Sequence, residues 1–296
     1  MATETVAADR PTSHGLAVAR GAQHRQVLTQ AGWYLLLTGL SLVVLFPIWM
    51  TVVRALSEPF VYIQEGQPLW PVAIDWGVFA TAWNDGDLGR SLLLSGIVTV
   101  VITGAQLMTS VLAAYSFAFV RYPLKNLLFV VVIASLLLPI EVTLVANIRT
   151  IRELGWLDSV QGLSAPFLAT AFGIFLIRQG FLGVPSELRD AARLDGFGHF
   201  AFLRRVAIPL NRPIIGSFTL IAALTAWNQY LWPRAATTTE RWETIQVTLR
   251  SVSVQNPERF NVGIAAAIVA SLPILVLLIV FQKQIIRGLT AGAVKG

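Results

Sequence analysis

The sequence predicts an all-α protein that lies in a membrane and crosses it six times. Of its 296 residues, 55% are hydrophobic and only 13% are charged, and the mean hydropathy is +0.67. A soluble domain carries about twice this charged fraction. Apolar runs near the roughly 20 residues that a membrane-spanning helix needs recur along the chain. The six predicted spans are residues 33–53, 92–120, 127–146, 162–181, 214–231 and 262–281.

The residue content excludes several kinds of chemistry. The chain has no cysteine, which excludes disulfides, thiolate catalysis and cysteine-ligated metals. Its three histidines, His14, His24 and His199, are scattered without the spacing of metal ligands. No Ser-His-Asp set is visible, and the glycine-containing residues 288–295 lack the spacing of an ATP-binding loop. We therefore expect no catalytic residue, no metal site and no bound cofactor in this chain.

The two ends of the chain differ from its apolar middle. Residues 1–32 are polar and carry no hydrophobic pattern, so we expect a disordered tail. The apolar run at residues 33–53 is longer than the segment of about 7 to 15 residues in a cleaved signal peptide, and it predicts an uncleaved first span. The membrane domain is predicted to cover residues 33–283, and residues 284–296 form a second tail.

Two features stand out between the first and fourth spans. The loop after the first span carries Trp70, Trp76 and Trp83, and tryptophan favours the lipid headgroup level, so part of this loop is predicted to lie at the outer membrane interface. The third span contains Glu141, and a carboxylate at membrane depth is costly. Glu141 therefore either has a function or lies near the outer end of the span, where water reaches it.

A charged island, residues 185–209, separates the fourth and fifth spans. Glu187 suits the first turn of a helix because of the helix dipole, and Gly196 can supply a left-handed stop, so residues 187–195 predict a short helix. A second amphipathic segment, residues 197–206, is predicted to place Phe197, Phe200 and Ala201 on one face. The short helix offers small side chains that let a partner's backbone approach and charged ones that can pair with it. These residues are Arg189, Asp190, Ala191, Ala192, Arg193 and Asp195.

The basic residues are distributed asymmetrically across the predicted spans. Most of the 22 Lys and Arg residues fall on the side that holds both tails and the charged island. Because basic residues accumulate on the cytoplasmic side of membrane proteins, both termini and the island are predicted to be cytoplasmic. The same asymmetry accounts for the pI near 10.2 without any binding of nucleic acid.

The island resembles a cytoplasmic loop of permease subunits of bacterial ABC importers. That loop has Glu-Ala-Ala, then Gly, then a Leu-Pro-like ending, and here the sequence has Asp190-Ala191-Ala192, Gly196 and Ile208-Pro209, with Asp in place of Glu. The C-terminal LTAGAVKG is similar to the tail of maltose-type permeases. Four shorter strings resemble the sn-glycerol-3-phosphate-type permease, namely RYPLKNLL (residues 121–128), LPIEV (138–142), LIRQG (176–180) and WNQYLWP (227–233).

The resemblance implies a function and a set of partners. The island helix would be a coupling helix that docks on an ATPase, through Glu187, Arg189, Asp190, Ala191, Ala192, Asp195 and Gly196. The partners would be a second permease, two ATP-binding subunits that hold ATP and Mg, and an extracytoplasmic solute-binding protein, in a bacterial inner membrane. A competing interpretation is a membrane receptor or scaffold without transport, which would account for the spans but not for the island or the tail.

The candidate solute path combines Glu141 with the end of the fifth span. If the helix continues to residue 231, Trp227 and Tyr230 lie one turn apart on nearly the same face, with Asn228 beside them. An aromatic face next to an amide suits a sugar or polyol, whose C–H faces stack while its hydroxyls need hydrogen bonds. An aromatic belt at the interface is the alternative. A phosphorylated solute would also need a cation, for which Arg149 and Arg178 are the candidates.

Overall fold

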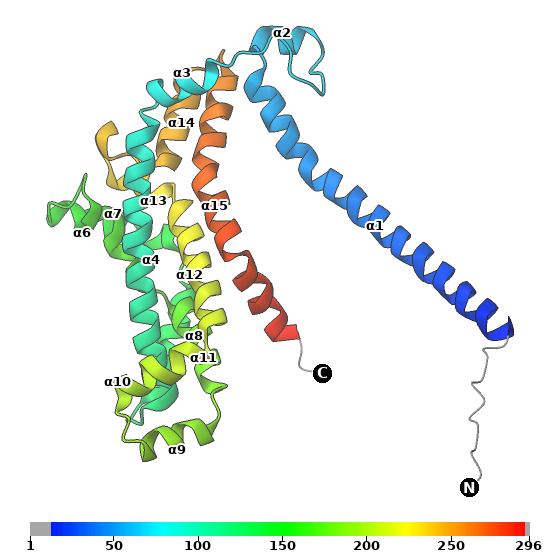
Figure 1. Ribbon diagram of the computed structural model, residues 1–296. Coiled ribbons are helices and arrows are strands. Elements are labelled where there is room, and N and C mark those ends of the chain that lie inside the picture. The colour runs from blue at the N-terminus through cyan, green and yellow to red at the C-terminus, as the bar shows by residue number, and fades with distance from the viewer. Residues whose placement is uncertain (1–12, 294–296) are drawn as a thin grey trace.

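The computed structural model describes residues 13–293, and all regular structure within them is helical (Figure 1). The elements are α1 (Ser13–Leu56), α2 (Pro59–Gln64), α3 (Val78–Asp85), α4 (Leu88–Phe119), α5 (Lys125–Ala134), η1 (Ser135–Leu137), α6 (Ile140–Glu153), α7 (Val160–Ser164), η2 (Ala165–Phe167), α8 (Ala171–Leu182), α9 (Ser186–Leu194), α10 (His199–Phe202), η3 (Leu203–Ala207), α11 (Ile208–Leu210), α12 (Arg212–Trp227), α13 (Leu231–Ala236), η4 (Glu240–Trp242), α14 (Ile245–Gln255) and α15 (Phe260–Ala293).

In the described part of the chain, three helices are long and apolar enough to cross a membrane on their own: Thr29–Leu56, Leu88–Phe119 and Phe260–Gln282. They coincide with the first, second and sixth predicted spans. Three more candidates are helix pairs bent by 98°, 50° and 82°, which raises the number of candidate spans to six if each pair is one span. The all-α class is confirmed for the described residues, which hold three to six candidate spans, and the six crossings stay a prediction.

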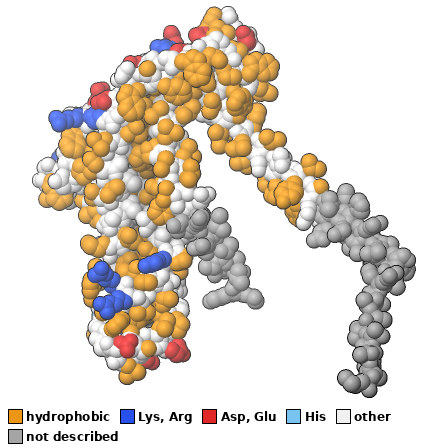
Figure 2. Space-filling view, in the orientation of Figure 1, with side chains coloured by type: hydrophobic (Ala, Val, Ile, Leu, Met, Phe, Trp, Pro, Cys, Tyr) orange, Lys and Arg blue, Asp and Glu red, His pale blue; other side chains and the backbone are white. Residues whose placement is uncertain are grey.

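The first helix starts earlier than the sequence indicated. The backbone is helical from Ser13, whereas we predicted a disordered tail through residue 32; residues 1–12 lie outside the described residues. Residues 13–32 contain Ala, Leu, Arg and Gln, which favour helix, and a span that is already helical propagates into such a flank at low cost. From α2 and α3, α1 diverges from the other helices (Figure 1). Its apolar side chains from Trp33 to Trp49 are exposed in the single chain, and hydrophobic side chains cover the described part of α1 (Figure 2).

The third predicted span is broken at Pro139. Proline lacks the N–H that would continue the helix and disfavours helical backbone in the residue before it, and Leu138 is extended (φ −87°, ψ 109°). The chain therefore turns by 98° between residues 125–137 and residues 141–153. This places Glu141 in the first turn of a new helix instead of in the middle of a straight span.

The remaining long helices pack along one another. Figure 1 shows α4, α12 and α15 side by side, with α8 packed against α4 and α12. The close approach of α8 to α4 and α12 depends on Gly173 of α8, because a Cβ there would overlap the ring of Phe218 and the hydroxyl of Ser110. The α9–α11 segment lies at one end of this bundle, and α2, α3 and α14 lie at the other.

Buried polar contacts hold the end that carries α14. Ser91 and Thr248 share a hydrogen bond of 2.7 Å, and the Ile245 amide donates to Ser95 Oγ at 2.7 Å. Asp158, between α6 and α7, accepts hydrogen bonds from the amide and hydroxyl of Thr238 and from the Thr239 amide. Partial burial acts to raise the pKa of the Asp158 carboxyl, but these hydrogen bonds outweigh it and hold the pKa below its usual range.

Candidate functional site

Helix α9 ends in a well-defined backbone motif. Pro185 precedes the helix, Glu187 lies in its first turn and Arg193 in its last, so both charges suit the helix dipole. Gly196 has φ +75°, its amide donates to the Arg193 carbonyl at 3.0 Å, and the Phe197 amide donates to the Ala192 carbonyl at 2.8 Å. These two bonds form a Schellman motif, which requires the left-handed residue. The predicted left-handed stop at Gly196 is confirmed.

One face of α9 points away from the bundle. Glu187, Asp190, Ala191 and Leu194 are all exposed, and their spacing of three and four residues places them on one side of the helix. Leu194 is 90% exposed and adds an apolar side chain to this side of the helix. We call these four residues the docking face. Asp195 and Gly196 follow it and are also exposed.

The predicted Ala191–Ala192 pair divides into two roles. Ala192 is 6% exposed and packs in an apolar cluster with Phe202 and Leu203, whereas Ala191 lies on the docking face. Ala192 therefore anchors α9 to the bundle, and Ala191 is free for a close contact. The expected apolar face of Phe197, Phe200 and Ala201 is wrong, because Phe200 is 71% exposed and Phe202 is buried. Gly198 delays the helix start to His199, and the π-helical turn η3 then shifts the register.

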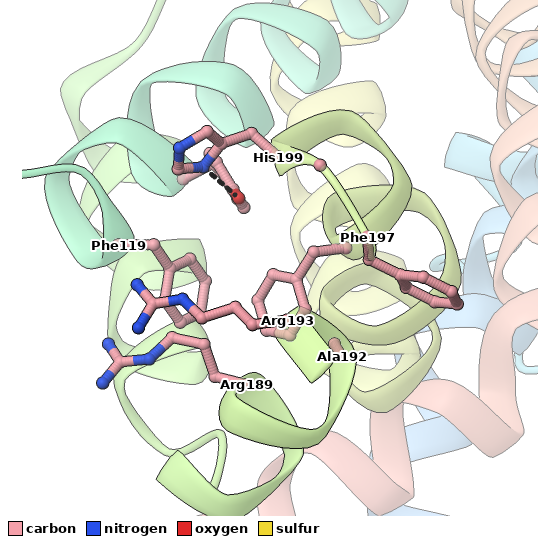
Figure 3. A pocket seen from close by; sticks show the side chains of 9 residues that line it. Phe119, Arg189, Ala192, Arg193, Phe197 and His199 are labelled. Atoms are coloured by element: carbon pink, nitrogen blue, oxygen red, sulfur yellow. Dashed lines mark hydrogen bonds between the residues drawn. The ribbon is translucent and has the colours of Figure 1, made fainter. Parts of the chain in front are cut away.

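A cavity of about 240 Å³ lies between α9 and the end of α4 (Figure 3). Arg189 and Arg193 extend side by side along it, so they flank the docking face instead of belonging to it. Arg193 lies 3.6 Å from Asp190. Tyr115 and His199 also line the cavity, and Tyr115 Oη is hydrogen-bonded to His199 Nδ1 at 2.9 Å. Sequence reasoning missed Tyr115, which only the packing of α4 brings to this place.

The four residues of the predicted solute path separate into two sets. Trp227 is 8% exposed and belongs to an apolar cluster with α3, α14 and α15, so it is a packing residue. Asn228 ends α12: its Nδ2 donates to the Leu224 carbonyl at 2.8 Å, and its Oδ1 accepts from Gln246 at 3.4 Å. The predicted shared face of Trp227 and Tyr230 is wrong, because α12 ends at Trp227.

Proline explains where α12 ends. A helix that continued through Pro233 would bring the proline ring against the carbonyl of Gln229 and would lose one hydrogen bond. Pro233 instead lies in the first turn of α13, where no amide donor is needed. Tyr230 precedes α13 and is turned toward a different part of the molecule from Trp227.

Glu141 and Tyr230 meet at a second cavity, of about 320 Å³, which we call the Glu141 cavity. Its lining comes from α4, α6, η2, α12 and α13 and combines polar with aromatic side chains. The lining residues are Ile102, Gln106, Glu141, Leu144, Phe167, Thr225, Ala226, Gln229, Tyr230, Leu231 and Trp232. Gln106 was not predicted, because it does not stand out in its own segment, and Gln229 belongs to the WNQYLWP string but was not assigned to the solute path.

Neither predicted cation reaches this cavity. Arg149 pairs with Glu153 on α6 at 2.9 Å. The Arg178 guanidinium lies 4.1 Å above the ring of Phe129, and its Nε donates to the Phe117 carbonyl at 3.4 Å. Arg178 is thus held where α8 meets α5 and the end of α4, and its position does not support the predicted role toward a phosphate in the Glu141 cavity.

Comparison with known proteins identifies the family. A family described as the binding-protein-dependent transport system inner membrane component matches residues 106–291. The chain belongs to this family. It is 33% identical over 256 residues to the sn-glycerol-3-phosphate transport system permease protein UgpE of Yersinia pestis bv. Antiqua (strain Antiqua), with 84% of this chain and 91% of the relative covered. The UgpE protein of Rhizobium meliloti (strain 1021) is 31% identical over 278 residues, with 90% and 98% covered.

Solved structures share the fold. A bacterial ABC transporter involved in the import of the acidic polysaccharide alginate aligns with a TM-score of 0.74 and 23% identity, covering 88% of this chain and 97% of that one. A second structure, of a bacterial alginate ABC transporter in complex with an alginate pentasaccharide-bound periplasmic protein, aligns with a TM-score of 0.57 and 16% identity, covering 84% and 93%. The predicted membership among importer permeases is confirmed, and the chain is a transport subunit, not an enzyme.

Proposed function

We propose that this chain is one permease subunit of an ATP-driven ABC importer and forms half of the translocation path for a sugar or a glycerophosphate-type solute. The family membership and the names of its relatives support the transport role and the class of solute. The docking face of α9 is the observation on this chain that carries the coupling role. A receptor or scaffold would have no need for an exposed, acidic and apolar helix face at one end of the bundle.

The docking face suits a cleft in an ATPase. Glu187 and Asp190 provide charges at its first half, Ala191 permits a close backbone approach, and Leu194 supplies an apolar contact at its end. The Schellman motif and the burial of Ala192 fix α9 relative to α10–α12. A displacement of α9 by an ATPase would therefore be transmitted directly into α12 through the chain and into α4 through the cavity contacts.

The complete importer would contain further subunits. We propose a second, homologous permease, two ATP-binding subunits that carry ATP and Mg²⁺, and an extracytoplasmic solute-binding protein. In this arrangement the chain lies in the bacterial inner membrane with six spans and both termini in the cytoplasm. The α9 end is then cytoplasmic, and the end with α2, α3 and α14 faces the solute-binding protein.

Reconstitution tests this function. The purified four-component complex in liposomes should hydrolyse ATP faster when the solute-loaded binding protein is added, and should accumulate solute. Ala191→Arg should abolish both activities, because an arginine on the docking face blocks close approach. Ala80→Arg, the same exchange at an exposed position of α3 at the opposite end, is the matched control for assembly with the ATP-binding subunits, because that end faces the solute-binding protein and not the ATPase. A complex that assembles but imports nothing would favour the scaffold interpretation.

A further inference from the structure

The lining of the Glu141 cavity is unusual in its charge. It contains one carboxylate, Glu141, and no lysine or arginine. Glu141 forms no ion pair in the described part of the chain, and its side chain is exposed. A carboxylate in a helix at membrane depth is costly unless water or a polar group reaches it. The cavity therefore combines a mainly apolar lining with one carboxylate that has no cationic partner there.

A second polar group in the cavity lacks a partner. The Oε1 atom of Gln229 is buried and accepts no hydrogen bond. An unsatisfied buried acceptor costs free energy, and a turn of the Gln229 side chain into the cavity would relieve this cost when a donor enters. The Gln106 amide nitrogen is already engaged, because its Nε2 donates to the Phe167 carbonyl at 2.8 Å. Glu141 therefore offers accessible acceptor oxygens to the cavity, and Gln229 can add one when its side chain turns, so the lining favours a ligand that brings donors.

The apolar part of the lining is aromatic. Phe167 and Trp232 meet edge to face with ring centroids 5.9 Å apart, and Tyr230 lies beside them. The indole N–H of Trp232 donates to the Gly162 carbonyl at 3.1 Å, which fixes the ring. Trp232 is only 2% exposed and supports the wall from behind, so Phe167 and Tyr230 present the aromatic surface that packs against the C–H face of a sugar or polyol. Acceptor oxygens beside a fixed aromatic wall match a molecule that has both C–H faces and hydroxyl donors.

We propose that the Glu141 cavity is a subsite for an uncharged, hydroxyl-bearing part of the solute, and that Glu141 selects against phosphate and carboxylate groups there. Hydroxyls can donate to Glu141 and Gln229, whereas the oxygens of an ionised phosphate only accept, and its charge is repelled by Glu141. A phosphorylated solute could place only its hydroxyl end in this cavity. The inference rests on the proposed function in one respect, namely that solute passes this cavity.

Charged thiol reagents test the selectivity without knowledge of the solute. The chain has no cysteine, so Thr225→Cys places a single thiol in the cavity by a nearly isosteric exchange. In the assembled complex, a cationic thiosulfonate should react with it faster than an anionic one. In the double variant Thr225→Cys/Glu141→Gln, the ratio of the cationic to the anionic labelling rate should fall about three- to tenfold, because one nearby charge has been removed. The rate of an uncharged thiosulfonate should stay the same in both backgrounds.

Trp70→Cys is the matched control, since Trp70 is 63% exposed in the loop after α2, and its rate ratio should not respond to Glu141→Gln. Sorbitol should slow labelling at position 225, and inorganic phosphate at the same concentration should not. The proposal would be overturned if the labelling rate did not depend on the charge of the reagent. It would also be overturned if phosphate slowed labelling as much as sorbitol does. Labelling requires no ATP hydrolysis, so it can be measured independently of import. If the complex imports solute but the ratio of the two rates does not change with Glu141→Gln, the subsite is refuted. If the ratio changes as expected but the complex never imports solute, the proposed function is refuted instead.

Discussion

Replacement of Gly196 by valine should uncouple ATP hydrolysis from transport while leaving the subunit in the membrane. Gly196 has φ +75°, and no atom lies within 4 Å of the Cβ that a side chain would add. The cost of the substitution is therefore torsional and not steric. Left-handed backbone costs a residue other than glycine about 1–2 kcal/mol, and a β-branched residue lies toward the upper end. This lowers the population of the native α9 end by a factor of about 5 to 30.

The chain provides a closely matched control for this prediction. Gly155 has φ +69°, also has no atom within 4 Å of an added Cβ, and ends α6 with the same two hydrogen bonds, from Gly155 to Arg152 and from Trp156 to Ile151. Gly155→Val should therefore carry the same torsional cost at a helix end far from α9. Gly196→Asn should restore much of the function, because asparagine adopts left-handed backbone more readily than valine.

The assay is the ATPase rate of the reconstituted complex with and without solute-loaded binding protein, normalised to the amount of inserted subunit. We expect a loss of stimulation in Gly196→Val, near-normal stimulation in Gly155→Val, and partial recovery in Gly196→Asn. Equal effects of the two valine variants would show that the loss comes from general destabilisation. Normal stimulation in Gly196→Val would refute the assignment of α9 as the coupling element.

Three further predictions follow from other parts of the structure. Asp158→Asn should lower the thermal unfolding midpoint of the complex at pH 7, because the folded state favours the ionised carboxyl. This stabilisation is present above the usual carboxyl pKa near 4 and is lost as the pH falls through the lowered pKa of Asp158. The difference in midpoint between the variant and the wild type should therefore vanish in acid. Trp227→Ala should reduce folded subunit, because truncation of a buried tryptophan costs about 3–5 kcal/mol, and an unchanged unfolding midpoint would contradict its packing role. Single cysteines at Trp76 and Asp190 should be labelled by an impermeant reagent in intact cells at position 76 only, and the opposite pattern would invert the topology.

The sequence predicts those features that depend on local signals. Hydropathy alone locates the first, second and sixth spans, because each is a continuous helix whose whole length must be apolar. The stop of α9 is equally local, since only the left-handed residue Gly196 is needed to define it. The start of the first helix at Ser13 was not predicted. The polar composition of the residues before the first span indicates disorder, whereas the adjoining span favours continuation of the helix.

The bends and the Glu141 cavity depend on contacts between distant segments. Pro139 and Pro233 are visible in the sequence, and both mark helix boundaries, but hydropathy continues across them and hides the break. The cavity brings Gln106 of α4 together with Glu141 of α6 and with Gln229 after α12. No pattern within one segment indicates that these three side chains share a space, because their proximity comes from the packing of α4, α6 and α12.

The most direct test of the coupling role is a contact measurement at the docking face. A photo-crosslinking amino acid at Ala191 should capture the ATP-binding subunit in the assembled complex, because Ala191 is exposed at the centre of that face. The same group at Ala80, on α3 at the opposite end, should capture no ATP-binding subunit. The crosslink at Ala191 should also persist when the ATP-binding subunits hold nucleotide, because ATP drives the importer in that state. Its absence from a complex that is active in ATP hydrolysis would contradict the docking of α9 on the ATPase.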